Sequence, residues 1–180
     1  MRLIGLLGGP ATGKTTVMRC YLKSLGYAVS MKWKSIQYTF YSSKTYGRVI
    51  VLGVYDNKPF SGTDRLSASA INDACEFLKN IKDWKGQETN TVVFEGDKLS
   101  CDRFFKEAKE SGYDLFLIKV APSQEVLELR RSKRVQNRKW VQTRDTKVEN
   151  LKNKWVVREM KNDDEIDKSR IVSAMLSFTM

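Results

Sequence analysis

A glycine-rich octapeptide near the start of the chain, GGPATGKT at residues 8–15, constrains the fold more than any other feature of the sequence. It satisfies the pattern G-x-x-x-x-G-K-[ST], in which the backbone wraps closely around a chain of phosphates. The octapeptide follows the apolar run at residues 3–7 and precedes a segment whose apolar residues have helical spacing. A strand, a glycine-rich turn and a helix in this order predict a phosphate-binding loop in an α/β fold.

Each part of this octapeptide has a chemical role in such a loop. Successive backbone N–H groups and the N-terminus of the following helix attract the phosphates. Lys14 would reach the β- and γ-phosphates, and the Thr15 hydroxyl would ligate Mg²⁺. The pattern therefore predicts that the chain binds ATP or GTP together with Mg²⁺. The predicted nucleotide-binding residues are Gly8, Gly9, Pro10, Ala11, Thr12, Gly13, Lys14, Thr15 and Thr16.

Short apolar runs alternate with segments of helical periodicity along the whole chain. This alternation predicts an α/β fold of the P-loop kinase type, with a mostly parallel five-stranded sheet and helices on both faces. An added β-hairpin is expected near residues 36–52, and residues 1–180 are expected to form one domain. The expected core strands are residues 3–7, 27–33, 91–94, 115–120 and 155–157.

The 180-residue chain contains no histidine, which excludes Ser-His-Asp and Cys-His nucleophile systems and histidine metal ligands. Any general base must be a carboxylate, a lysine, a tyrosine or a thiol. Cys20, Cys75 and Cys101 are widely spaced, which argues against a disulfide framework and fits a reducing cytoplasm. No apolar run reaches 18 residues, so we expect no membrane-spanning segment.

The strand at residues 91–94 ends in the acidic sequence FEGD, which includes Glu95 and Asp97. Because strand carboxyl ends face the ligand crevice of such a sheet, both acids are expected near the phosphates. They could hold Mg²⁺ directly or through water, so the predicted metal ligands are Thr15, Glu95 and Asp97. A motor or helicase ATPase would usually end this strand in Asp-Glu, and this chain does not.

Positive charge is concentrated late in the chain. The formal net charge is +11, and residues 130–154 carry ten basic against two acidic residues, a net +8. Such a segment is either a solvated face or a surface that contacts a polyanion, and charge alone does not distinguish them. In small P-loop kinases a mobile lid lies at this place, so we expect a basic lid at about residues 130–150. The lid candidates for stabilising a transferring phosphoryl group are Arg134, Arg138 and Arg144, followed by Lys147 and Asn150 on the acceptor side.

The acceptor of a phosphoryl group is expected to bind at about residues 34–66. Asp64 is the favoured general base, with Asp56 as the second candidate, because a carboxylate must replace the missing histidine. Arg65 is expected to clamp a phosphate or the acceptor. Aromatic and basic residues of the predicted hairpin would be divided between the core and a stacking surface for nucleic acid.

Four segments together resemble the bacteriophage 5-hydroxymethyluracil-DNA kinases. They are GGPATGKTT at residue 8, YDNKPFSGTDRLS at 55, FEGDKL at 94 and RKWVQTRDTKVENL at 138. The resemblance implies an ATP-dependent P-loop kinase that phosphorylates the hydroxymethyl group of 5-hydroxymethyluracil within DNA, an early step of thymine hypermodification, in the host cell cytoplasm. It also implies that Lys14 and Thr15 serve ATP and Mg²⁺, and that Asp64, Arg65, Glu95 and Asp97 line the acceptor pocket.

Three other functions remain open at this point. A free deoxynucleoside-monophosphate kinase or a polynucleotide 5′-hydroxyl kinase would use the same phosphate loop on a different acceptor. A nucleotide-gated DNA-binding module would hydrolyse ATP without phosphorylating anything, although the lid-like arginines argue against it.

Overall fold

The computed structural model describes residues 1–56, 61–67, 69–81 and 91–180. Residues 57–60, which belong to the predicted acceptor loop, lie outside this description. The elements in chain order are β1 (Arg2–Leu7), α1 (Lys14–Lys23), β2 (Tyr27–Trp33), β3 (Ile36–Ser43), β4 (Gly47–Leu52), the 3₁₀ helix η1 (Thr63–Arg65), α2 (Ala70–Asn80), β5 (Thr91–Glu95), α3 (Asp102–Glu110), β6 (Asp114–Ala121), α4 (Gln124–Ser132), α5 (Arg138–Lys154), β7 (Val157–Lys161) and α6 (Glu165–Thr179).

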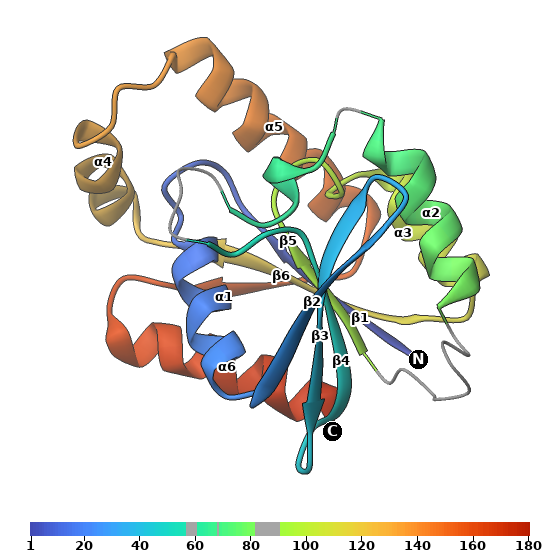
Figure 1. Cartoon of the computed structure of the whole chain (residues 1–180). Coiled ribbons are helices and arrows are strands. Elements are labelled where there is room, and N and C mark those ends of the chain that lie inside the picture. The colour runs from blue at the N-terminus through green and yellow to red at the C-terminus, as the bar shows by residue number, and fades with distance from the viewer. Residues whose placement is uncertain (57–60, 68, 82–90) are drawn as a thin grey trace.

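These strands form one seven-stranded sheet in the order β2-β3-β4-β5-β1-β6-β7 (Figure 1). The pairs from β4 through β5, β1 and β6 to β7 are all parallel, while β3 pairs antiparallel with both β2 and β4. The predicted α/β class with a mostly parallel sheet is confirmed.

The predicted hairpin corresponds to β3 and β4, but it is not a separate insertion. Strand β4 pairs in parallel with β5 and supplies the fifth parallel strand, whereas β2 lies at the antiparallel edge. Apolar alternation could not reveal this, because it reports which face is buried and not which strand is the neighbour. Most residues of β2 are exposed, as an edge position allows.

Helices cover both faces of the sheet (Figure 1). Ile4 and Leu6 of β1 pack toward α1 and α6, and Leu3 and Leu7 pack toward α2, α3 and α5. Between them, a Cβ at Gly5 would lie 2.7 Å from the ring of Phe94, so only glycine fits beside β5 there. No helix in the described part of the chain combines the length and apolarity needed to cross a membrane.

The last strand is shifted relative to the prediction of residues 155–157. Trp155 instead follows the last turn of α5 and packs its ring edge-on against Phe105, with 5.5 Å between ring centroids. The strand itself runs from Val157 to Lys161 and pairs with β6. Its residues are mostly exposed, so it carries little of the apolar signal on which the prediction depended.

Three parallel strands end together at one edge of the sheet, and each is followed at once by glycine. These glycines are Gly53 after β4, Gly8 after β1 and Gly96 after β5, all with positive φ. The chain therefore turns sharply three times at the carboxyl edge of the sheet, which is where ligands bind in open α/β folds.

Candidate active site

The predicted phosphate loop joins β1 to α1 as expected. The Lys14 ammonium reaches back over the loop and donates to the backbone oxygens of Gly8 and Gly9, at 2.8 and 2.9 Å. The Thr12 hydroxyl donates to Gly9 O at 3.1 Å. Gly13 precedes α1 with φ +96°, a backbone conformation that residues with a β-carbon rarely adopt. The loop therefore presents a helix N-terminus and a lysine at one place, as an anion site requires.

Residues far along the chain hold this loop from outside. Asn162 Nδ2 donates to Thr12 O at 2.8 Å, and Arg130 donates to Asn162 O at 2.9 Å. Arg131 Nε donates to Pro10 O at 3.3 Å. None of these three supporting contacts is predicted by the sequence. For Asn162 no signal in the sequence could have shown it, because the contact joins positions 150 residues apart.

A pocket of about 390 Å³ opens over the loop. It contains residues of the phosphate loop together with carboxylates and cations from four other segments. Its lining is Pro10, Ala11, Gly13, Lys14, Thr15, Thr16, Arg19, Ser61, Asp64, Glu95, Arg134, Gln136 and Trp140. The structure thus brings the predicted base, the predicted lysine and one predicted lid arginine into a single cavity.

Glu95 is the most unusual carboxylate of this pocket. It is 1% exposed, and its Oε1 accepts a 2.9 Å hydrogen bond from the Thr15 hydroxyl. Burial raises the pKa of the Glu95 carboxyl to about 7, while nearby Lys14 and the Thr15 hydrogen bond oppose this rise. Burial also lowers the pKa of the Lys14 ammonium, against the opposing effect of Glu95 and Asp64. Burial and the opposite charge thus act against each other on both groups.

The donor set around Thr15 fits Mg²⁺. A hydroxyl and one carboxylate oxygen stand together there, and among the described residues no group of three His, Cys, Asp or Glu could form a protein cage for a metal. Mg²⁺ is commonly held by one or two protein oxygens, with water and substrate phosphates completing its shell. Thr15 and Glu95 would hold it in this way.

Asp64 lies on η1, which is fastened to the end of β5. Its Oδ1 accepts a hydrogen bond from the Asp97 backbone N–H at 2.7 Å, and the Thr63 hydroxyl donates to Glu95 O at 3.0 Å. A Cβ at Gly96 would lie 2.6 Å from the Thr63 hydroxyl, so glycine is needed for this approach. Asp64 is exposed on the pocket side of this contact, where an acceptor hydroxyl can reach it.

Asp56 and Arg65 occupy a different position from Asp64. They form an ion pair of 3.0 Å, and Arg19 donates to the Asp56 backbone oxygen at 2.9 Å and to the Ser61 hydroxyl at 3.3 Å. Asp56 lines a second cavity of about 790 Å³ between α1 and the β2–β3 hairpin. Arg19 lines both cavities, and its place four residues after Thr15 is the signal that could have identified it.

The segment predicted as a lid, about residues 130–150, comprises the end of α4, the turn after it and most of α5, and its cations lie in different places. Arg134 lines the phosphate pocket, whereas Arg138 lines a neighbouring cavity of about 520 Å³. Arg144 and Lys147 both bind the Asp97 carboxylate, at 2.5 and 3.0 Å. Asp97, predicted as a metal ligand, is thus held by α5.

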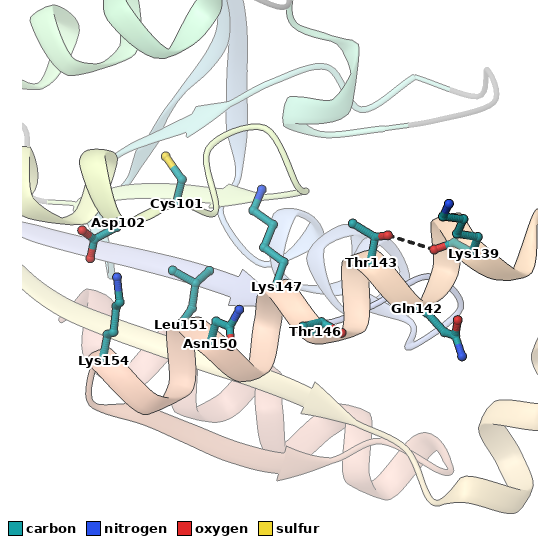
Figure 2. A pocket seen from close by; sticks show the side chains of 10 residues that line it. All are labelled: Cys101, Asp102, Lys139, Gln142, Thr143, Thr146, Lys147, Asn150, Leu151 and Lys154. Atoms are coloured by element: carbon teal, nitrogen blue, oxygen red, sulfur yellow. Dashed lines mark hydrogen bonds between the residues drawn. The ribbon is translucent and has the colours of Figure 1, made fainter.

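Asn150 lies farther along α5, in a groove of about 610 Å³ that includes the start of α3 (Figure 2). The Lys147 side chain projects into the same groove, which the Lys154 side chain enters at the far end near Asp102 (Figure 2). The structure therefore places Asn150 in this groove and not among the residues that line the phosphate pocket.

The aromatic residues of the hairpin region belong mostly to the core. The rings of Trp33 and Tyr38 pack against Phe77, with centroids 5.6 and 5.0 Å apart. Tyr41 is buried against the helices on the opposite face. The expected exposed stacking surface is therefore not formed by these three rings.

The sequence model of the family described as P-loop Nucleotide Kinase3 matches residues 1–168. A solved structure of a sugar kinase from Janibacter sp. HTCC2649, unliganded, superposes with a TM-score of 0.48 at 13% sequence identity, covering 99% of this chain and 94% of that one. No curated protein sequence matches the chain.

Proposed function

The chain belongs to the P-loop Nucleotide Kinase3 family, and on this premise we propose that it transfers the γ-phosphoryl group of ATP to the hydroxymethyl group of 5-hydroxymethyluracil within DNA. Membership of the family implies a nucleotide-dependent phosphotransferase with a P-loop kinase fold. It does not identify the acceptor of the phosphoryl group.

The observation that carries phosphotransfer is the shared pocket of Lys14, Asp64 and Glu95. Lys14 is positioned to leave the loop carbonyls and bind the β- and γ-phosphate oxygens. Arg134, exposed at the pocket rim, can stabilise negative charge on the phosphoryl group during transfer. Bound Mg²⁺, held by Thr15 and Glu95, would neutralise the phosphate oxygens.

Asp64 performs the proton transfer in this mechanism. The acceptor hydroxyl attacks the γ-phosphorus, its O–H proton passes to the Asp64 carboxylate, and the bond from the γ-phosphorus to the bridging oxygen of ADP breaks. The Asp97 N–H bond at 2.7 Å occupies one Asp64 oxygen and fixes the carboxylate. Among the residues that the structure describes, none donates to the other oxygen, so it is available to the acceptor.

A polymeric acceptor is supported by the distribution of charge. Arg131, Arg144, Lys147 and Lys152 of the basic segment have carboxylate partners. The other cations of that segment make no ion pair with any residue that the structure describes; they are Arg130, Lys133, Arg134, Arg138, Lys139 and Lys154. Because unpaired cations next to an open groove lower the free energy of a polyanion there, DNA is a better fit than a small neutral acceptor.

The test is transfer of label from γ-labelled ATP to two DNA duplexes that differ only in carrying 5-hydroxymethyluracil or thymine. We expect label in the first duplex alone, on an internal nucleoside identified by mass spectrometry, and strong inhibition by salt. Thymine lacks the hydroxyl and serves as the matched control. Label on free nucleoside monophosphates only, or on 5′ termini only, would instead establish one of the two other kinase activities.

A further inference from the structure

Asp97 stands between two cations of α5 at the acceptor end of the site. Its Oδ2 accepts from Arg144 Nη1 at 2.5 Å, and its Oδ1 accepts from Lys147 Nζ at 3.0 Å. Lys147 also donates to the Asp97 backbone oxygen at 2.8 Å. The three side chains are 30–33% exposed, so an anion from solution can reach them and compete for the same donors.

The charges of this cluster do not balance. A single carboxylate faces a guanidinium and an ammonium, and Arg144 Nε is buried with no hydrogen-bond partner in the described part of the chain. The guanidinium also lies over the Trp140 ring, 5.6 Å from its centroid, which limits its orientations. The partly exposed guanidinium, next to a lysine, matches the oxygens of a phosphate group.

The cluster is also next to the proposed chemistry. The Asp97 backbone N–H is bonded to Asp64, the proposed base. Lys147 lines the groove along α5 in which the side chains of Gln142, Thr143 and Asn150 also lie (Figure 2). A phosphate held by Arg144 and Lys147 would therefore place the nucleotide that carries it between this groove and Asp64.

We propose that Arg144 and Lys147 form the binding site for a phosphate group of the acceptor, and that Asp97 occupies it as an internal anion which the acceptor phosphate displaces. The inference rests on the proposed function for the existence of a phosphate-bearing acceptor. That phosphate is either the monoester of a free nucleotide or a diester of a polynucleotide, because both present the non-bridging oxygens that the two cations bind.

The experiment measures the binding of two probes, thymidine 5′-monophosphate and a short single-stranded DNA that contains 5-hydroxymethyluracil. The protein is first saturated with a non-hydrolysable ATP analogue and Mg²⁺, which keeps probe phosphates out of the phosphate loop. Asp97→Asn should bind at least one probe about threefold to tenfold more tightly, because a competing anion is removed. Arg144→Gln should bind the same probe about tenfold more weakly.

Glu149→Gln is the matched control. It removes the same charge from the neighbourhood of α5, but its carboxylate is paired with Lys119 and not with the cluster. We expect its probe affinities to stay within about twofold of the original chain. Thermal unfolding of each variant verifies that the fold is retained, and Arg144→Gln carries the test if Asp97→Asn does not fold.

The outcomes separate the two phosphate sources. If the two substitutions change the affinity for the DNA probe as expected, the bound phosphate is a diester. If they change only the affinity for the monophosphate, the bound phosphate is that of a free nucleotide, which counts against the DNA acceptor. If Asp97→Asn binds both probes no more tightly than Glu149→Gln does, the internal-anion proposal is overturned. If the probe affinities change as expected but no phosphoryl group is transferred to DNA, the proposed function is rejected and the phosphate site is retained.

Discussion

At the phosphate end of the site the side chains donate mainly to backbone atoms, whereas at the proposed acceptor end two cations share one carboxylate. Lys14, Thr12, Asn162 and Arg131 all donate to carbonyls of the phosphate loop. Asp97, in contrast, is held by Arg144 and Lys147 through partly exposed ion pairs. Backbone-anchored groups are fixed by the fold, while exposed ion pairs are weak and exchange with solutes.

This difference indicates that the two ends of the site differ in how readily their side chains change partners. The backbone of the phosphate loop is held in place before any ligand arrives, so that little besides the Lys14 ammonium must change partners when phosphates bind. The acceptor end can exchange its internal partners for those of a substrate at small cost. Substitutions at the two ends should therefore have different effects, and the following measurements examine that contrast.

Replacing Lys14 should cause the largest loss, because it removes the cation that we propose binds the transferring phosphate. We expect Lys14→Ala to lower kcat by about 10³-fold, the order of effect of removing a preorganised transition-state donor. Steady-state transfer from labelled ATP measures this. Lys109→Ala, which removes an exposed lysine of α3, is the control for charge, and equal losses in both variants would contradict the role of Lys14.

Asp64→Asn should lower transfer by about 10²-fold or more, because the amide cannot accept the hydroxyl proton. The amide oxygen can still accept the Asp97 N–H, so nucleotide binding should remain near that of the original chain. Single-turnover transfer and binding of an ATP analogue are measured on the same preparation. Unchanged turnover would move the base role to Asp56 or Asp97.

Glu95→Gln should change stability in a pH-dependent way. The pKa of Glu95 is raised from 4.5 to about 7 in the fold, so the folded protein binds this proton more tightly than the unfolded chain does. The free energy of unfolding therefore falls as pH rises from about 4.5 to about 7, and the loss is complete above that range.

The neutral glutamine should remove this loss. We expect Glu95→Gln to be more stable than the original chain by up to ~3 kcal/mol at pH 8, and to differ little near pH 4. Urea unfolding at the two pH values measures this, with the exposed Glu110→Gln as control. A variant that is less stable at pH 8 would show that the ionised carboxylate stabilises the fold.

Asn162→Ala tests whether the phosphate loop depends on support from the far end of the chain. The loss of its buried bond to Thr12 O should cost about 1–2 kcal/mol of stability and weaken ATP-analogue binding severalfold. Titration calorimetry and thermal unfolding measure the two effects. Asn153→Ala on the exposed face of α5 is the control, and equal nucleotide affinity in both variants would remove Asn162 from the site.

The sequence alone determined the phosphate loop itself, although not the distant residues that support it. The pattern at residues 8–15 lies between a strand and a helix, and each of its functional groups acts within a few residues of its neighbours. Local spacing also predicted the class of fold, because the alternation of strands and helices leaves few ways to bury both faces of a sheet.

Only the tertiary structure decided the rest. The Thr15–Glu95, Asp64–Asp97 and Arg144–Asp97 contacts join positions 80, 33 and 47 residues apart. The tertiary structure also decided that β4 and not β2 enters the parallel part of the sheet, and that burial raises the pKa of the Glu95 carboxyl. Each of these features depends on which segments meet in space. The packing of the whole chain decides which segments meet, and the spacing of residues along the sequence does not show it.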